Sequence, residues 1–193
     1  MFKINKLVFY NYIPYYDEKV FDFGDQDGTT IIFGDNNIGK TSFIKGIRFL
    51  FFNDLSNNPD DPNFNILANI NTKAFNEQKF EFFVSMNFSY DGTKYTFIRR
   101  YAKKPEVFGQ PKSDKDFQDY EVIKTDEKSF GPLERKRIID KVIPKNISEF
   151  IFFDGENIKK YVEILNNDGT TGAENRRVKN AINNIIGTPY LDS

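Results

Sequence analysis

The residues with the clearest chemistry run from Gly34 to Thr41, where the chain reads G-D-N-N-I-G-K-T and matches the phosphate-loop pattern G-x-x-x-x-G-K-[ST] in full. The two glycines let the backbone turn so that successive N–H groups point toward an anion. In such a loop the lysine ammonium, here Lys40, contacts the β- and γ-phosphates of a nucleotide, and the next hydroxyl binds Mg²⁺. The candidate nucleotide-binding residues are Gly34, Asp35, Asn36, Asn37, Ile38, Gly39, Lys40, Thr41 and Ser42.

A phosphate loop works only between a strand that enters it and a helix that leaves it. Residues 29–33 are apolar and β-branched, which predicts a buried strand. The apolar residues after Lys40 have helical spacing as far as Phe52 and predict an amphipathic helix. Its positive N-terminal end would add to the same anion site. The alternative is a glycine-rich turn before a helix, with no ligand; the full motif in this context favours the nucleotide site.

Composition excludes several kinds of chemistry. The 193 residues contain no cysteine and no histidine, so thiol nucleophiles, Cys/His zinc sites and histidine acid–base catalysis are absent. The formal net charge of −1 gives no global attraction to nucleic acid, so any DNA contact would be local or made by another part of an assembly. No apolar run approaches the roughly 20 residues of a membrane span. With no signal-peptide pattern at the N-terminus, we expect a cytoplasmic protein.

The first half of the chain predicts mainly strands. Residues 2–9 are expected to form an edge strand, paired with a second short strand at 20–23. Residues 53–76 are rich in Asn, Asp and Pro, which predicts an irregular surface connection. Alternation over 80–90 and the return at 94–100 predict a β-hairpin that turns at Asp91-Gly92.

The second half predicts two strands and three helices. After an exposed connection at 103–115, a short strand is expected at 120–123, and a helix begins near Pro132 and ends before Pro144. The apolar run 150–153 predicts a strand that leads into Asp154. Two further helices are expected over about 157–165 and 178–186, the last one closing at Gly187 before Pro189.

The segment around Asp154 has three interpretations. An apolar strand that ends in a carboxylate is typical of a Walker B strand, in which Asp154 would hold Mg²⁺ and Glu156 would activate water. On that interpretation the chain is an autonomous P-loop NTPase or kinase. The second interpretation is a buried strand that ends in an Asp-Gly turn without any chemistry. The third comes from the resemblance of the chain to a known family.

Four segments, in this order and spacing, resemble the N-terminal lobe of an SMC-like ABC ATPase head, and among such proteins the DNA sulfur modification (DndD) family and related antiphage-defence ATPases. The segments are residues 7–12, 34–41, 152–158 and 178–191. The resemblance implies one lobe over residues 1–193 with an α/β P-loop NTPase fold of ABC-ATPase type. A mixed sheet would surround the phosphate-loop helix, and the 80–100 hairpin would belong to an antiparallel β-subdomain. A kinase would instead place the 150–153 strand beside the 29–33 strand.

The resemblance also implies roles for individual residues. Asp154 would lie by the γ-phosphate and Mg²⁺, where many relatives have a glutamine. Its role would be to sense or position the γ-phosphate rather than to hold the metal. Asn37 replaces a glycine that many heads carry, and asparagine tolerates a left-handed backbone better than most residues. Many heads have an Arg-Ser pair near the nucleotide base; here residues 13–16 read I-P-Y-Y, which makes Tyr15 and Tyr16 the candidates to stack on the base.

The family's Leu-Ser-Gly-Gly signature, its second apolar strand ending in Asp-Glu and its heptad arm are missing from the sequence. The resemblance therefore implies half of an ATPase head, with ATP and Mg²⁺ bound between this lobe and a second head. The expected partners are a complementary C-terminal lobe, a nuclease or modification subunit, and DNA through the assembly. We expect the isolated chain to bind Mg²⁺–ATP weakly and hydrolyse it negligibly. A degenerate interaction module is the non-enzymatic alternative, and the absence of an Asn-Lys-x-Asp motif disfavours a GTPase.

Overall fold

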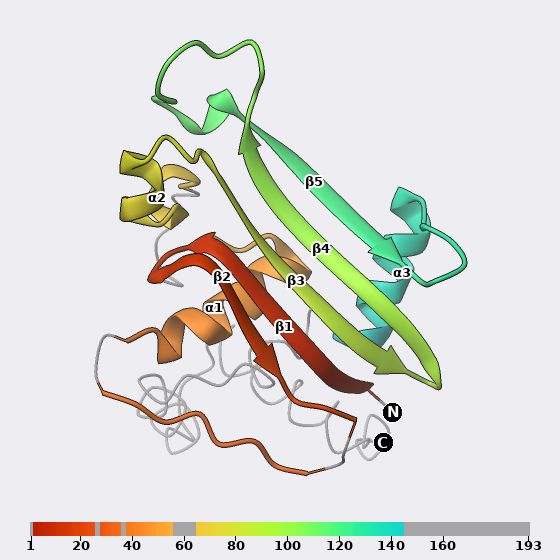
Figure 1. Cartoon of the computed structure of the whole chain (residues 1–193). Coiled ribbons are helices and arrows are strands. Elements are labelled where there is room, and N and C mark those ends of the chain that lie inside the picture. The colour runs from red at the N-terminus through yellow and green to blue at the C-terminus, as the bar shows by residue number, and fades with distance from the viewer. Residues whose placement is uncertain (1, 26–27, 36–37, 56–64, 145–193) are drawn as a thin grey trace, which may run out of the picture. The chain divides into compact units, whose positions relative to one another are not determined.

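The computed structural model describes residues 2–25, 28–35, 38–55 and 65–144 (Figure 1). Within these ranges the main element is a five-stranded antiparallel sheet with strand order β2-β1-β3-β4-β5. The strands are β1 (Phe2–Tyr12), β2 (Tyr15–Asp22), β3 (Glu81–Tyr90), β4 (Thr93–Lys103) and β5 (Phe117–Lys124). The α-helices are α1 (Lys40–Phe52), α2 (Thr72–Asn76) and α3 (Pro132–Val142), with 3₁₀ turns at Leu67–Asn69 and Asp114–Asp116.

The β3–β4 hairpin is confirmed, and its turn has the predicted chemistry. Asp91 and Gly92 both have positive φ, 48° and 81°. Asp and Gly tolerate this conformation, which matches the twist of the two flanking strands. β5 and α3 are also confirmed, and α3 begins at Pro132, where proline loses no helical hydrogen bond.

β1 pairs with β2 as predicted, but the prediction that it is an edge strand is wrong. It pairs with β2 on one side and with β3 on the other, so that β2 and β5 are the outer strands of the described sheet. The cause is visible in the middle of β1, where Leu7, Val8 and Phe9 are all buried. Consecutive buried residues point to both faces of a sheet, which is typical of an interior strand.

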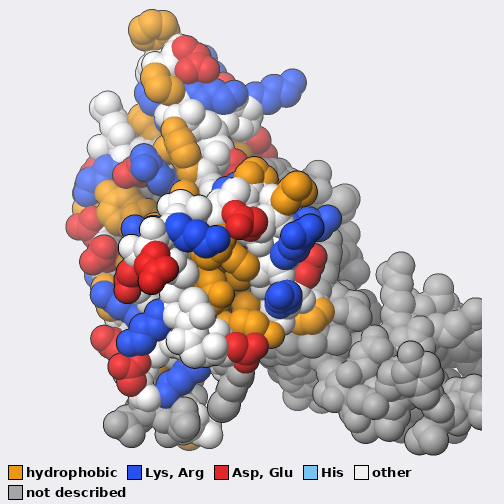
Figure 2. Space-filling view, turned by 90° about the vertical axis from the view of Figure 1, so that its right-hand side faces the viewer, with side chains coloured by type: hydrophobic (Ala, Val, Ile, Leu, Met, Phe, Trp, Pro, Cys, Tyr) orange, Lys and Arg blue, Asp and Glu red, His pale blue; other side chains and the backbone are white. Residues whose placement is uncertain are grey.

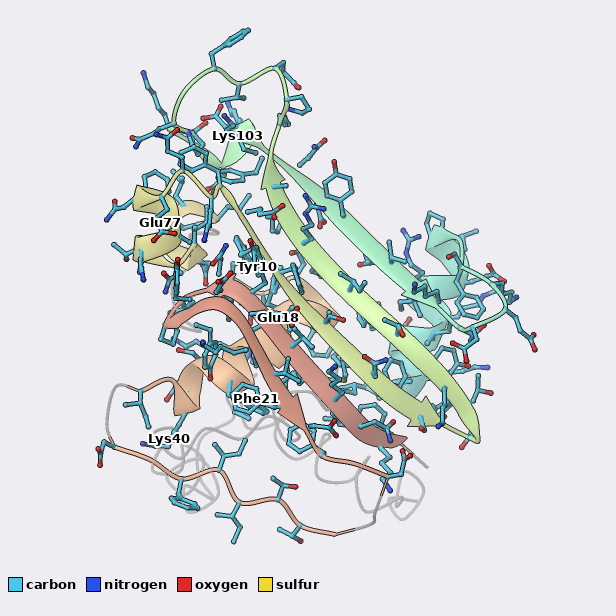
Figure 3. All side chains as sticks on the ribbon, in the orientation of Figure 1. Tyr10, Glu18, Phe21, Lys40, Glu77 and Lys103 are labelled. Carbon is cyan, nitrogen blue, oxygen red and sulfur yellow. The ribbon has the colours of Figure 1, made fainter. Side chains whose placement is uncertain are left out.

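One face of the sheet carries the core. Large apolar side chains alternate along the strands toward this face, and Figure 1 shows α1 and α3 on this side of the sheet. The α1 ring of Phe49 lies 5.4 Å from that of Phe82 and 5.8 Å from that of Tyr12, measured between ring centroids. The opposite face carries residues such as Tyr10 and Glu18, labelled in Figure 3. The phosphate-loop helix is therefore held on the sheet mainly by aromatic packing.

The buried strand predicted at residues 29–33 does not form in the described part of the chain. These residues pair with none of the five strands, and Ile31 and Phe33 are 78% and 87% exposed. A strand forms only when its backbone groups have neighbours to bond. The antiparallel part of the predicted fold is present and includes β1 and β2 beside the hairpin. The mixed sheet around α1 is not formed by the described residues.

The prediction of an irregular surface connection over residues 53–76 is wrong for its described C-terminal part. Ile66, Ile70 and Ala74 are buried, and α2 lies within the segment. Asn71 caps α2 by accepting from the backbone N–H groups of Lys73 and Ala74, at 3.0 and 3.2 Å. The asparagines that suggested a solvated loop therefore satisfy backbone groups next to the core.

Segments 145–193 lie outside the described residues, and with them the predicted strand at 150–153 and the last two predicted helices. Among the helices that the structure describes, none has both the length and the apolar character needed to cross a bilayer.

Candidate nucleotide-binding site

α1 begins directly after the second glycine of the phosphate-loop motif. Gly39 is its N-cap with φ 109° and ψ 7°, a backbone conformation that favours glycine. Among the residues that the structure describes, no side chain caps this helix end, and its first turn contains no acidic residue. The first N–H groups of a helix have no partner within the helix, and they carry the positive end of its dipole. This end of α1 therefore offers donors and positive potential to an anion.

Lys40 folds back over the start of the loop. Its ammonium donates to the backbone oxygens of Gly34 and Asp35, each at 2.6 Å. Figure 3 shows Lys40 at the end of α1 where the loop enters the helix. The structure thus brings Gly34, Asp35, Gly39 and Lys40 together, with Thr41 exposed beside them. Asn36 and Asn37 lie outside the described residues.

Tyr15, the first residue of β2, holds the loop at its junction with α1. Its hydroxyl donates to the backbone oxygen of Gly39 at 2.8 Å, and the same oxygen accepts the helical hydrogen bond from the N–H of Phe43 at 2.9 Å. A Cβ on Gly39 would lie 3.0 Å from Pro14 Cγ and 3.1 Å from the Tyr15 hydroxyl oxygen. Gly39 is therefore needed both for its positive φ and for the close approach of this turn.

The ring of Tyr15 belongs to an aromatic platform under the first turns of α1. It stacks on Phe9 at 4.5 Å between centroids and meets Phe21 edge-on at 5.9 Å. Phe43 of α1 lies on the same group, 5.6 Å from Phe9 and 5.1 Å from Phe21. Burial raises the pKa of Tyr15 to about 12, so its hydroxyl remains protonated, and a donor, even at pH values above the ordinary pKa of a tyrosine.

Gly46 allows α1 to approach the sheet at this platform. A Cβ at Gly46 would lie only 2.2 Å from Cε1 of Phe9. Any larger side chain would push the helix away from β1. The position of the phosphate loop over the sheet therefore depends on a glycine five residues beyond the motif.

Tyr16 contacts charged side chains in and just after α2, away from the phosphate loop. Its hydroxyl donates to Glu77 Oε2 at 2.6 Å, and the ammonium of Lys73 lies 4.0 Å from its ring centroid (Figure 3). Lys79 is 5.0 Å from the same ring. Within the chain, Tyr15 supports the loop and Tyr16 holds α2 beside β2. That either ring stacks on a nucleotide base stays a prediction.

A profile of the AAA domain family matches residues 6–187, which is almost the whole chain. The chain belongs to the AAA domain family. A search of curated proteins found no match. This AAA domain is therefore an ATPase domain of the general SMC-like type, and nucleotide binding is the property that its loop geometry fits.

The AAA family implies a divalent metal beside the nucleotide, and the described residues offer one candidate ligand for it. Thr41 is exposed in the first turn of α1, where its hydroxyl is a suitable hard oxygen donor. Among the described residues there is no group of three His, Cys, Asp or Glu side chains that could hold an ion by itself. This donor set fits Mg²⁺, which keeps waters and phosphate oxygens as most of its ligands. Asp154 and Glu156, the predicted acidic members of the site, lie outside the described residues.

Proposed function

We propose that this AAA domain is the ATP- and Mg²⁺-binding half of an SMC-like ATPase head. The observation that carries the proposal is the contact of the Lys40 ammonium with the Gly34 and Asp35 carbonyls, beside a helix end that no side chain caps. A cation and the N–H groups of a helix end at one point of the chain suit a polyphosphate better than any neutral ligand.

In this proposal each residue of the loop has one task. Lys40 would exchange its carbonyl contacts for phosphate oxygens, and the loop N–H groups would hold the phosphate chain. Thr41 would hold Mg²⁺, which when bound neutralises the charge that develops on the phosphate oxygens. Asp154 would position or sense the γ-phosphate, and Glu156 would orient the attacking water.

We further propose that hydrolysis requires a complementary lobe. The AAA domain's sequence lacks a Leu-Ser-Gly-Gly signature and a second strand ending in Asp-Glu, which the proposed mechanism takes from a C-terminal lobe and a second head. Preorganised charges on both sides of the transferred phosphoryl group are what accelerate its transfer.

The proposed setting is DNA modification, restriction, defence or repair, as in the DndD-like ATPases that the sequence resembles. DNA would be reached through the assembly and its nuclease or modification subunits. On the face in Figure 2, basic and acidic side chains alternate and no broad basic patch forms, in keeping with the net charge of −1. This distribution favours contact with DNA through partners over direct binding by this face.

The test is calorimetric titration of the purified chain with Mg²⁺–ATP. Lys40→Ala removes a cation that contacts phosphate in an exposed loop, so we expect at least about a hundredfold weaker binding with little loss of stability. Lys94→Ala, at the far hairpin, is the matched control and should bind as the wild type does. If Lys40→Ala binds Mg²⁺–ATP with unchanged affinity, the assigned site is wrong.

The second candidate is an autonomous P-loop NTPase or kinase, favoured by the apolar run 150–153 directly before Asp154. In that case Asp154 is the metal carboxylate and no second lobe is needed. Phosphate release by the chain alone separates the two proposals. A rate near one per second, about the low end for enzymes, that disappears in Lys40→Ala would establish the autonomous enzyme. Negligible release, restored by the complementary lobe, supports the half-head.

A further inference from the structure

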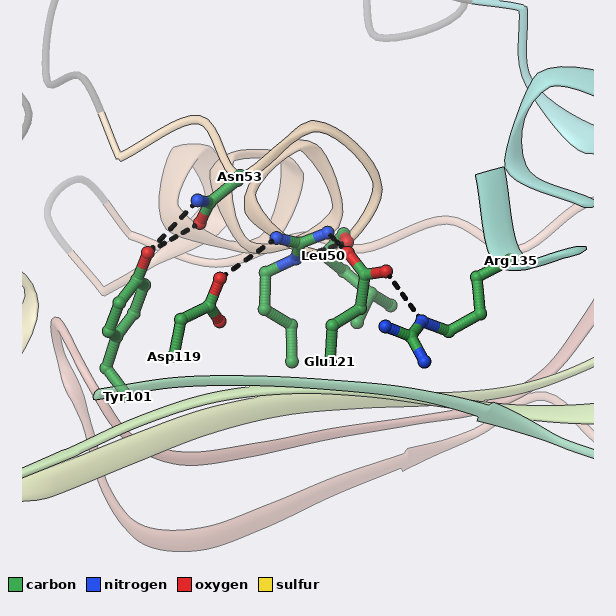
Figure 4. Close-up of polar contacts among 7 residues, drawn as sticks. Leu50, Asn53, Tyr101, Asp119, Glu121 and Arg135 are labelled. Carbon is green, nitrogen blue, oxygen red and sulfur yellow. Dashed lines mark hydrogen bonds and ion pairs between the residues drawn. The ribbon is translucent and has the colours of Figure 1, made fainter. Parts of the chain in front are cut away.

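The end of α1 far from the nucleotide site is anchored by a buried arginine. Near a helix C-terminus the last four carbonyls lack helical partners. The carbonyl of Phe49 accepts from the N–H of Asn53 at 2.8 Å. The next carbonyl, that of Leu50, accepts instead from Nε of Arg99 on β4 at 2.9 Å (Figure 4). A strand of the sheet thus satisfies one of the terminal carbonyls of the phosphate-loop helix.

Arg99 is itself held firmly. Its side chain is almost fully buried, and it forms an ion pair and hydrogen bond with Glu121 of β5. A second carboxylate, that of Asp119, lies 3.7 Å from Arg99 Nη1. The other oxygen of Glu121 accepts from Nε of Arg135 on α3 at 2.9 Å (Figure 4). Arg135 also donates to the carbonyl of Phe130 at 3.0 Å.

An arginine in this place has a cost that an apolar residue would avoid. Burying a charge requires compensation by partners, and replacing buried ion pairs with apolar residues is often neutral or stabilising. Position 99 lies in the buried phase of β4, between Phe97 and Tyr101. The guanidinium can direct Nε to a helix carbonyl and its other nitrogens to carboxylates at the same time, which lysine cannot do. A cation there also complements the negative end of the helix dipole.

We propose that Arg99 is a positioning residue of the nucleotide site, acting on the phosphate-loop helix from its far end. The inference rests on the proposed nucleotide binding. α1 has 13 residues and, as a rigid helix, a length of about 20 Å. Tyr15 fixes its loop end and Arg99 fixes its other end, which sets the direction of the N–H groups at the loop. With Arg99 replaced, α1 can rock about the Tyr15–Gly39 contact, and these N–H groups lose their alignment with the phosphates.

The test compares Arg99→Lys with Arg100→Lys. Arg100 is the neighbouring residue on the opposite face of the sheet, where it pairs with Glu81 at 2.5 Å and lies over the ring of Tyr120. We expect Arg99→Lys to weaken Mg²⁺–ATP binding about tenfold, or about 1.4 kcal/mol, and Arg100→Lys to change it less than about twofold. Hydrogen exchange should become faster for amides in α1 and stay unchanged in the β3–β4 hairpin. Thermal unfolding is measured in parallel.

Glu121→Gln keeps Arg99 and the volume of the side chain at position 121 but removes the negative charge that pairs with Arg99. This second variant is used if Arg99→Lys does not fold. We expect about threefold weaker binding from this variant, with faster exchange in α1. A lower unfolding temperature at unchanged Mg²⁺–ATP affinity would show a merely structural role and overturn the inference alone. Failure of the wild type to bind Mg²⁺–ATP would overturn the proposed function, and the inference with it.

Discussion

The Tyr15→Phe substitution isolates one atom of the nucleotide site. It removes the hydroxyl that donates to the Gly39 carbonyl at 2.8 Å and keeps the ring that stacks on Phe9. The carbonyl keeps its second donor, the N–H of Phe43 at 2.9 Å, so it is not left unsatisfied. The variant therefore loses one neutral hydrogen bond without forming a cavity or burying an orphan acceptor.

The size of the effect follows from this geometry. A hydrogen bond between neutral groups contributes a net free energy of about 0.5–1.5 kcal/mol. Because the Gly39 carbonyl keeps a second donor, the loss in Tyr15→Phe should fall in the lower half of that range. If the bond mainly holds the loop in its binding conformation, about 1 kcal/mol appears as roughly fivefold weaker Mg²⁺–ATP binding. If it only stabilises the fold, the same free energy lowers the unfolding temperature by about 2–4 °C and leaves the affinity unchanged.

The assay is titration with Mg²⁺–ATP together with thermal unfolding of the free protein. Tyr10→Phe is the matched control: Tyr10 also stacks on a phenylalanine, Phe83 at 5.1 Å, but on the opposite face of the sheet. We expect about two- to fivefold weaker binding from Tyr15→Phe, which corresponds to about 0.5–1.0 kcal/mol, and unchanged binding from Tyr10→Phe. Equal affinities for Tyr15→Phe and wild type would refute the view that Tyr15 positions the loop.

The remaining predictions concern packing and pH. Gly46→Ala should gain about 1 kcal/mol in helix propensity but lose more through overpacking against Phe9, for a net destabilisation of about 1–2 kcal/mol in urea unfolding. In Gly131→Ala the new Cβ would lie an ordinary 3.8 Å from a Glu134 oxygen, so this control should stay within about 0.5 kcal/mol of wild type. Because burial raises the pKa of Tyr15 to about 12, above its ordinary value, its contribution to stability is complete below about pH 10 and is lost as pH rises toward 12. The stability difference between wild type and Tyr15→Phe should therefore narrow between pH 10 and 12, and a constant difference would contradict the assignment.

The features that could be predicted from the sequence are those fixed by neighbouring residues. The phosphate loop and the Asp91-Gly92 hairpin are local patterns whose backbone demands only a few residue types can meet. The strand expected at 29–33 is different, because a strand forms only with partners that lie elsewhere in the sequence. Apolar character alone therefore predicted burial where the described chain leaves Ile31 and Phe33 exposed.

The supports of the site were missed because each joins distant parts of the chain. Tyr15 lies 24 residues before Gly39, and Arg99 lies 49 residues after Leu50. A signal for Arg99 was nevertheless present: β4 alternates Phe97, Arg99 and Tyr101, which puts a charge in the phase of the strand that faces the core. A charged residue in a buried phase requires polar partners. For Arg99 one of these partners is the Leu50 carbonyl at the end of α1.

The arrangement around α1 also suggests why ATP binding and hydrolysis would be separable in this AAA domain. The loop, its lysine and its two supports all lie within a single compact unit, Met1–Val142. The acidic residues proposed to position the γ-phosphate and water, Asp154 and Glu156, follow in a later segment of the chain. A phosphate-loop helix held at both ends by the sheet can keep the N–H groups of the loop aligned without those acids, whereas phosphoryl transfer needs the acids placed on the opposite side of the phosphate. Affinity should therefore respond to Tyr15 and Arg99, and turnover to whatever brings the acidic segment and the second lobe into place.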